Sequence, residues 1–294
     1  MFDNVNVNLN NLKCEIPADK IYEDALHPTV KAAGAIVSYP FRIVRSLLSP
    51  LEKWILLKEE NVDKITTSIS EKLESVDPSK IITPESYIAV PALQAISYCM
   101  DNDELRDIYA NLLAKAMNKD TAKSVHPAFT EIIKQLSPLE AMILKQNKLN
   151  TLILCDLRLQ KKSNPIGLSE NLKKLSDAKR TQLGIDLYKN LSCLKIEDCT
   201  ENEITTSIEN LERLGILLIE DVTLIHKDYS PFENCKTYIN NKKNVKYFQE
   251  LAASESFSLD QKVKNIYLES EFALIAKSAI VTNLGKSFIE ICVL

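Results

Sequence analysis

The sequence predicts a mainly α-helical protein, in which an N-terminal helical bundle is followed by a winged-helix-like α+β domain with a long insert between its wing strands. Apolar residues up to Lys148 recur at the three- and four-residue spacing of amphipathic helices. From Thr151 onward, stretches with a two-residue period, typical of strands, alternate with helical ones. We therefore expect a flexible leader at 1–19, a helical domain at 20–148, and a winged-helix-like domain at 149–294 whose insert spans about 227–270.

The segment 25–51 is the most distinctive part of the N-terminal region, because it contains no acidic residue and is otherwise largely apolar. Its uncharged run from Ala32 to Phe41 is 10 residues long, whereas a membrane-spanning helix needs about 20. Two interpretations remain open. The segment is either a helix buried in the bundle with a thin basic stripe exposed, or an amphipathic element that binds an anionic membrane or a partner. In the second case the contact residues are Lys31, Val37, Phe41, Arg42, Val44, Arg45 and Leu48.

The helices of the expected bundle have recognisable starting signals. The tetrapeptide SPLE occurs at 49–52 and again at 137–140, and each copy supplies a Ser cap, a Pro in the first turn and a Glu three residues after the cap. Thr83-Pro84 starts a helix that we expect to bend or break at Pro91. The clearest helix spans 101–119, where we expect Asp101 to be the N-cap, and a further helix starts at His126-Pro127. About six helices are therefore expected in 20–148.

The mixed domain begins with an alternating strand at 151–160, in which Cys155, Leu157 and Leu159 share one side. Helices are expected at about 173–192 and 202–214, the second ending at Gly215. Strands at 216–225 and 271–281 and a last helix at 284–293 complete the order of a winged helix. The insert at 227–270 is partly helical and rich in lysine, and its candidate phosphate contacts are Lys242, Lys243 and Lys246.

The expected recognition helix of this winged helix is poorly suited to DNA. Between residues 203 and 214 it offers Arg213 against Glu203, Glu209 and Glu212. A DNA duplex would repel such a face, so sequence-specific DNA binding is not expected. We expect the domain to dock on a protein, and a winged-helix nucleic-acid-binding regulator is the alternative.

Motifs that would identify an enzyme are missing from the sequence. Only five glycines occur, and there is neither a dinucleotide-binding nor a P-loop pattern. His27, His126 and His226 are far apart, and the first two precede prolines, which favours helix-start residues over metal ligands. The acidic residues at 101–107 lack the spacing of a calcium loop. No cofactor or metal is expected, although a catalytic site assembled by the fold stays an open alternative.

Composition and cysteine usage predict a cytoplasmic protein. Hydrophobic residues make up 45% and charged residues 26% of the chain, as in ordinary folded proteins, and the net charge is −4. The seven cysteines are scattered without a CxxC pair, and the N-terminal residues are not expected to be a signal peptide, so reduced thiols are expected.

One long segment also resembles a known family. The stretch NDELRDIYANLLAKAMNKDTAKSVHPAFTEIIKQLSPLEAMIL, together with NLERLGIL and VTNLGKSFIEIC near the C-terminus, is similar to the Abi-alpha family of bacterial phage-defence proteins, named for abortive infection. The similarity extends more loosely from Ile21 to Cys292. The family supplies no catalytic residues that can be carried over to this chain.

The resemblance implies a role in defence against phage and no mechanism. Because no catalytic motif is found and the segment 25–51 suits a membrane or a partner, we expect a non-enzymatic protein that acts through protein–protein or membrane-surface contact. The expected partner is a protein, for example a phage component, and homo-oligomerisation is compatible with the sequence. For the membrane alternative, the protein would bind peripherally at the inner membrane face through the basic stripe of 25–51.

Overall fold

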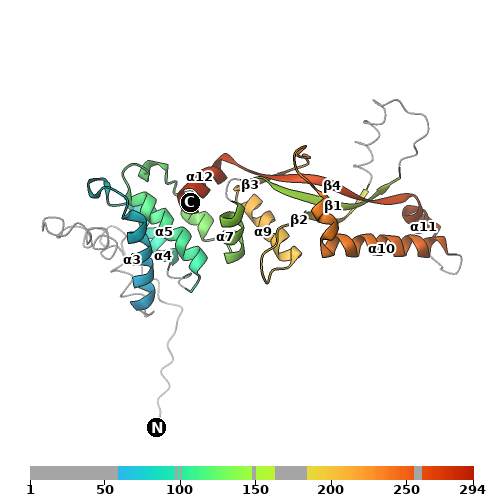
Figure 1. Cartoon of the computed structure of the whole chain (residues 1–294), viewed down its shortest axis with the longest axis horizontal. Helices are drawn as coiled ribbons and strands as arrows, with labels where there is room; N and C mark the ends of the chain where they lie inside the picture. The colour runs from blue at the N-terminus through green and yellow to red at the C-terminus, as the bar shows by residue number, and fades with distance from the viewer. Residues whose placement is uncertain (1–58, 97–98, 100, 148–149, 163–183, 255–259) are drawn as a thin grey trace, which may run out of the picture. The chain divides into compact units, whose positions relative to one another are not determined.

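The computed structural model describes residues 59–96, 99, 101–147, 150–162, 184–254 and 260–294 (Figure 1). In this part the protein is mainly helical and contains a four-stranded antiparallel sheet. The chain divides into two compact units, which we call unit 1 (up to Pro138, together with Glu290–Leu294) and unit 2 (Leu139–Ile289). The expected leader and the first SPLE motif lie outside the described residues.

Unit 1 contains the helices α3 (Glu59–Leu73), α4 (Ser86–Ile96), α5 (Asp103–Met117) and α6 (Ala128–Ile133). Two short 3-10 helices, η3 (Pro78–Lys80) and η4 (Ala122–Ser124), lie in the connections. α5 forms the centre of the unit, since nine of its 15 residues are buried. The amide of Asn111, itself buried, donates a hydrogen bond of 2.9 Å to the carbonyl of Cys292 and so ties the C-terminal residues to α5.

Three sequence predictions in unit 1 have clear outcomes. The N-cap of α5 is Asn102 and not Asp101, because the Asn102 side chain accepts a hydrogen bond of 2.9 Å from the N–H of Leu105. α4 is not broken at Pro91, which lies inside the helix, so packing of its apolar face overrides the missing N–H. The helix-start role of His126 is confirmed, since its Nδ1 accepts from the N–H of Ala128 at 3.1 Å.

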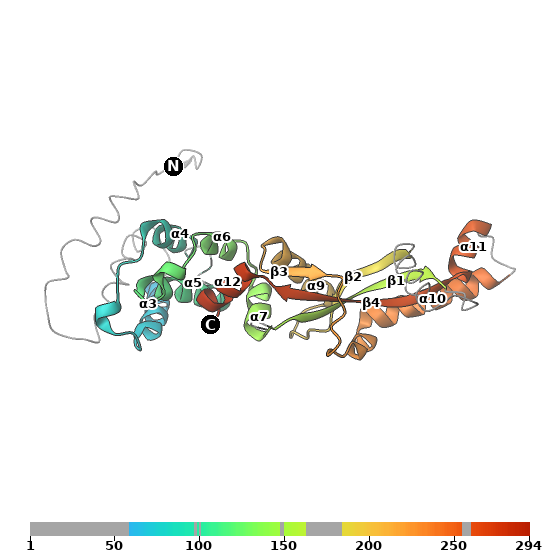
Figure 2. The same ribbon diagram turned by 90° about the horizontal axis from the view of Figure 1, so that it is seen from above.

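Unit 2 is built on the sheet, whose strands are β1 (Leu152–Lys161), β2 (Gly184–Ser192), β3 (Leu217–Glu220) and β4 (Ser270–Val281) in the order β2-β1-β4-β3. The unit also contains most of α7 (Pro138–Asn147), α9 (Glu201–Arg213), η5 (Ser230–Asn234), α10 (Lys236–Ala253) and α11 (Gln261–Leu268). α12 (Asn283–Cys292) begins in unit 2 and ends in unit 1. Figure 2 shows α10 and α11 beside the end of the sheet where β4 begins.

The core of the sheet lies beneath η5 and α10. Cys155 and Leu157 of β1 pack with Leu191, Phe232 and Tyr238, all of them buried. β1 and β4 pair along their whole length, from Leu152 opposite Ala279 to Lys161 opposite Ser270. The alternating pattern of β1 therefore predicted the strand correctly, but Asp156 on its expected polar side is buried as well.

The expected helix at about 173–192 is wrong over its second half. Residues 173–183 lie outside the described part, but Gly184–Ser192 is the strand β2, which pairs antiparallel with β1. Pairing with a buried neighbouring strand decides the structure here over local preference. A strand at this position departs from the element order of a winged helix.

The remaining elements of unit 2 agree more closely with the sequence. α9 ends at Arg213 with Leu214 as its C-cap, and Gly215 follows directly. The φ of Gly215 is +75°, and its N–H donates a hydrogen bond to the carbonyl of Glu212, which confirms its helix-ending role. The insert lies between β3 and β4, which pair antiparallel. β3 ends at Glu220, whereas the sequence predicted a strand up to Ile225. Ile225 is 91% exposed, so no packing holds it on the sheet.

Candidate functional site

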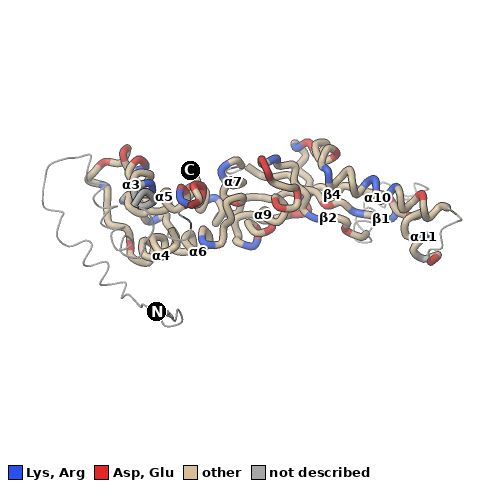
Figure 3. Tube along the Cα trace, turned by 90° about the horizontal axis from the view of Figure 1, so that it is seen from below, with Lys and Arg blue, Asp and Glu red and all other residues tan. Residues whose placement is uncertain are grey.

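The two groups of contact residues predicted from the sequence have different outcomes. All the residues predicted to touch a membrane or partner, Lys31, Val37, Phe41, Arg42, Val44, Arg45 and Leu48, lie outside the described residues. The predicted phosphate contacts Lys242, Lys243 and Lys246 lie on α10 and are exposed. Figure 3 shows lysine positions in blue along this helix. Their role in binding stays a prediction.

α10 is held firmly on unit 2 by a narrow apolar face. Tyr238, Val245 and Ala252 are its buried residues, and the ring of Tyr238 meets Phe272 of β4 edge-on at 5.2 Å. At the N-terminus, the carboxylate of Glu201 accepts hydrogen bonds of 2.8 Å from the N–H groups of Lys236 and Thr237. These contacts fix the direction of the helix and leave its outer side to solvent.

Aromatic rings gather on the outer part of α10 and on α11. Phe248 lies 5.6 Å from Tyr247, edge-on, and 5.4 Å from Tyr267 of α11, with an angle of only 24° between the ring planes. Tyr247 is 59% exposed and Phe248 41% exposed. We call Lys242, Lys243, Lys246, Tyr247, Phe248 and Tyr267 the α10–α11 surface. The sequence identified its lysines but not its rings, because the rings come from two helices that only the fold brings together.

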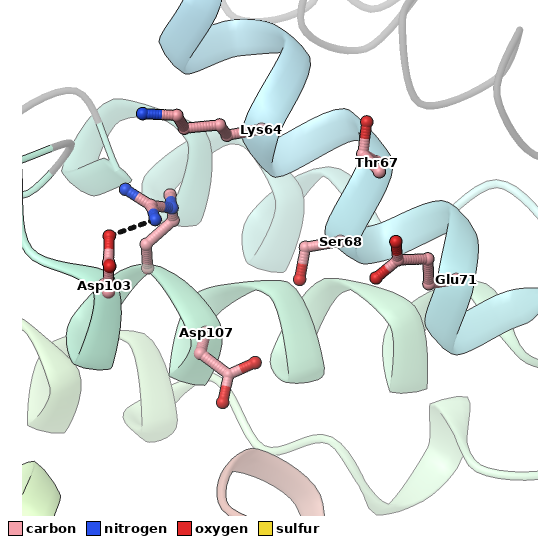
Figure 4. Close-up of a pocket in the computed structure, with 7 residues that line it drawn as sticks. Lys64, Thr67, Ser68, Glu71, Asp103 and Asp107 are labelled. Atoms are coloured by element: carbon pink, nitrogen blue, oxygen red, sulfur yellow. Dashed lines mark hydrogen bonds and ion pairs between the residues drawn. The ribbon is translucent and has the colours of Figure 1, made fainter.

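A second candidate is a polar groove of about 560 Å³ in unit 1 (Figure 4). Its lining side chains come from α3 and α5 and are Lys64, Thr67, Ser68, Glu71, Asp103, Arg106 and Asp107. Arg106 forms an ion pair with Asp103, and Lys72 lies 2.8 Å from Asp107. Within the acidic cluster at 101–107, Asp103 therefore pairs with a residue of its own helix, and Asp107 pairs α5 with α3.

A third candidate is a pocket of about 510 Å³ in unit 2, at the N-termini of α9 and α10. Cys193, Cys199 and Cys235 contribute to its lining. Burial raises the pKa of the Cys193 and Cys235 thiols above the usual 9.0, so both stay protonated at neutral pH. Because the thiolate is the reactive form, both cysteines are less reactive than a thiol whose pKa has its usual value.

Glu201 in the same pocket is also committed to the fold. Burial pushes its pKa upward, but hydrogen bonds from Thr237 and Lys236 outweigh that effect and hold the pKa below the usual 4.5. The carboxylate is therefore ionised at neutral pH and serves as the cap of α10.

The sequence did not predict a charged network on the sheet. Lys277 Nζ of β4 lies 3.4 Å from both Asp156 Oδ2 and Asp221 Oδ1, and it donates to Asn190 Oδ1 at 3.1 Å. Asp156 is buried, and its Oδ1 accepts from the N–H of Asn190 at 2.9 Å. The Asn190 amide in turn donates to Glu209 of α9 at 2.9 Å. This network joins β1, β2, β4 and α9.

The described part of the chain contains neither a metal-binding cluster nor a membrane-spanning helix. Among these residues, no group of three or more His, Cys, Asp or Glu side chains is placed to hold a metal ion. None of the helices in the same part of the chain has the length and apolar character needed to cross a membrane.

Comparison with known proteins gives one result. The model of the family described as abortive infection alpha matches residues 57–292. No curated protein and no solved structure matches the chain. The matched residues include α5, the cysteine-lined pocket of unit 2 and the α10–α11 surface. They do not include the segment 25–51. Since the match covers most of the sequence, the chain belongs to the abortive infection alpha family.

Proposed function

We propose that this protein takes part in abortive infection against phage, and that it acts by binding a macromolecular partner and not by catalysing a reaction. The observation that carries the proposal is the family match over residues 57–292. The name of the family supplies the biological role, and the chemistry of the described residues supports the binding mode.

The candidate sites favour binding over catalysis for physical reasons. In the groove between α3 and α5, acidic and basic side chains pair with each other. In the cysteine-lined pocket the thiols of Cys193 and Cys235 are protonated, and Glu201 is occupied as a helix cap. The α10–α11 surface instead offers exposed rings and lysines, which suit a large partner.

The charged side chains of α9 support the view that this helix does not read DNA. Glu203 forms a capping box with Thr200, Glu209 accepts from Asn190, and Glu212 accepts from the N–H of Ile219 at 3.0 Å. The helix thus uses its acidic groups in the fold and keeps a face that repels phosphates. A protein-docking role for unit 2 remains part of the proposal.

Phage challenge of a sensitive bacterial host that produces the protein tests the proposed role. We expect the culture to survive when phage are few, and to stop growing with little phage release when every cell is infected. Recovery and growth of fully infected cells, or the absence of protection across a panel of phages, would contradict the role.

The non-catalytic mode has its own test. Isosteric variants Cys193→Ser, Cys199→Ser and Glu201→Gln should keep phage protection, after their folding is checked by circular dichroism. Loss of protection in any one of them, with an unchanged melting temperature, would indicate that the pocket performs chemistry.

The membrane-surface mode through 25–51 is a separate part of the proposal. Anionic headgroups would attract Lys31, Arg42 and Arg45 at about 1 kcal/mol each, which requires added burial of apolar side chains for firm binding. Co-sedimentation with anionic liposomes at low salt, using wild type and a Lys31/Arg42/Arg45→Glu variant, measures this mode. If wild type stays in the supernatant and the variant still protects, the membrane contact is wrong.

A further inference from the structure

We propose that the α10–α11 surface binds single-stranded nucleic acid, with its lysines on the phosphates and its aromatic rings stacked on unpaired bases. This inference names the partner class of the surface and rests on the proposed binding function. It depends on three features of the surface: its charge, its rings and its rigidity.

The charge of α10 is opposite to that of the whole chain. The helix carries Lys236, Lys242, Lys243 and Lys246 against the single acidic residue Glu250, whereas the protein has a net charge of −4. Lys246 lies 3.7 Å from Glu250, an exposed and therefore weak pair, and within the described part of the chain no ion pair involves Lys243. Exposed ammonium groups on an otherwise acidic protein favour a polyanionic partner.

The rings narrow the choice among polyanions. Tyr247 follows Lys243 by four residues, so an ammonium group and an exposed ring lie on the same face of α10. Next to it, Phe248 and Tyr267 lie nearly parallel at 5.4 Å, an arrangement that a flat base can extend. Stacking on aromatic side chains beside a basic groove is how proteins hold single strands without reading sequence. A duplex keeps its base faces covered and would gain only the phosphate contacts.

The surface is also held in place before any partner binds. Gln249 donates from its amide to the carbonyl of Tyr267 at 3.2 Å and to that of Ser270 at 2.8 Å, which joins α10 to the end of α11 and the start of β4. Lys242 lies over the ring of Tyr238 at 5.3 Å from its centroid. Because Phe248 and Tyr267 stack on each other across two helices that are joined in this way, little conformational entropy is lost when a base stacks beside them.

The test measures binding of the full-length protein to labelled oligonucleotides of about 16 nucleotides by fluorescence anisotropy. Single-stranded RNA, single-stranded DNA, the matching DNA duplex and anionic phospholipid vesicles are compared. We expect either or both single strands to bind more tightly than the duplex, and the comparison of RNA with DNA identifies which strand the surface prefers.

Three variants separate the phosphate contacts from stacking. Lys243→Glu/Lys246→Glu should weaken single-strand binding more than about tenfold and reduce the slope of log affinity against log salt by about 0.7 for each phosphate that is no longer bound. Tyr247→Ala should weaken binding about tenfold, while Tyr247→Phe keeps the ring and the affinity. The matched control is Lys119→Glu/Lys123→Glu, the same charge change at exposed positions of unit 1, which should bind as wild type does.

The inference is overturned if wild type binds the duplex as tightly as the single strands, binds only the vesicles, or binds nothing. The inference is also overturned if Lys119→Glu/Lys123→Glu weakens binding as much as Lys243→Glu/Lys246→Glu does. In that case the loss of affinity would come from the net charge of the protein and not from the α10–α11 surface. The phage challenge keeps this result distinct from the proposed function: a protein that protects cells but binds no single strand contradicts only the inference. A protein that binds single strands but never protects contradicts only the defence role.

Discussion

The central helix of unit 1 and the long helix of unit 2 use their side chains in different ways. α5 buries nine of its 15 residues, including Ile108 and Leu112, neither of which is exposed. α10 buries three of its 18 residues and leaves Tyr247 59% exposed. Most side chains of α5 are therefore required by packing. Most of the outer side of α10 is not required by the fold and is available for contact with a partner.

The largest effect expected from this comparison is on stability. Phe129→Ala in unit 1 removes a ring that is 1% exposed and should lower the free energy of unfolding by about 3–5 kcal/mol. Tyr247→Ala on α10 should lower it by less than about 1 kcal/mol, because the ring is mostly in solvent. Urea denaturation followed by circular dichroism measures both values. Equal costs would show that the outer side of α10 is part of the core.

For the ion pairs the order of the two units is reversed, because the more buried pair lies in unit 2. The side chains of Lys277 and Asp156 in unit 2 are 13% and 8% exposed, and those of Lys72 and Asp107 in unit 1 are 28% and 34% exposed. Lys277→Met leaves a buried carboxylate without its cation and should cost about 3 kcal/mol. Lys72→Met should cost about 1 kcal/mol or less.

A second substitution sharpens this comparison. Asp156→Asn added to Lys277→Met removes the uncompensated charge, so denaturation should show that part of the free energy of unfolding is recovered. Strictly additive costs in the double variant would show that Lys277 and Asp156 do not stabilise each other.

The elements that the sequence predicts correctly are those whose signals are local. The strand β1 follows from the alternation of Cys155, Leu157 and Leu159, and its partner β4 from a largely apolar run. α9 and its ending just before Gly215 follow from apolar spacing and from a glycine, the residue type that most readily adopts the positive φ found there. Each of these signals lies within a few neighbouring residues.

The features that the sequence does not predict depend on long-range pairing. The sequence predicts a helix where β2 lies, because the only strong reason for a strand there is the neighbouring β1, to which it pairs from Gly184 to Ser192. Asp156 alternates with apolar residues and is expected on the polar side of a strand, but Lys277 and Asn190 cover it. The candidate site follows the same rule: its lysines share one helix, while Phe248 and Tyr267 come together only through the fold.

A smaller loss of stability is expected from backbone strain at the glycine that follows α9. Gly215 has φ of +75°, where a side chain is strained, although an added Cβ would meet only ordinary contact with Leu284 at 3.5 Å. Gly215→Ala should therefore lower the free energy of unfolding by about 1–2 kcal/mol through backbone strain alone. Gly215→Asn should cost less, because Asn tolerates this conformation better. Thermal denaturation of the two variants gives the ranking, and an alanine variant as stable as the asparagine one would contradict the strain.

The smallest expected effect concerns the thiols and compares the two units once more. Burial raises the pKa of Cys99 in unit 1 from 9.0 to about 11. Burial raises the pKa of Cys193 in unit 2 further, assisted by the neighbouring Cys235. At pH 8 iodoacetamide should therefore alkylate both thiols in the folded protein more slowly than in the unfolded chain, with Cys99 the faster of the two.

The same shifts set the direction of a pH effect on stability. A thiol that keeps its proton in the folded state but ionises in the unfolded chain contributes stability below pH 9. That stability is lost as the pH rises from 9 through the folded pKa of about 11 for Cys99. Cys99→Ser should therefore flatten the decline in melting temperature across this pH range. If the variant declines as steeply as wild type, ionisation of Cys99 does not contribute to alkaline unfolding.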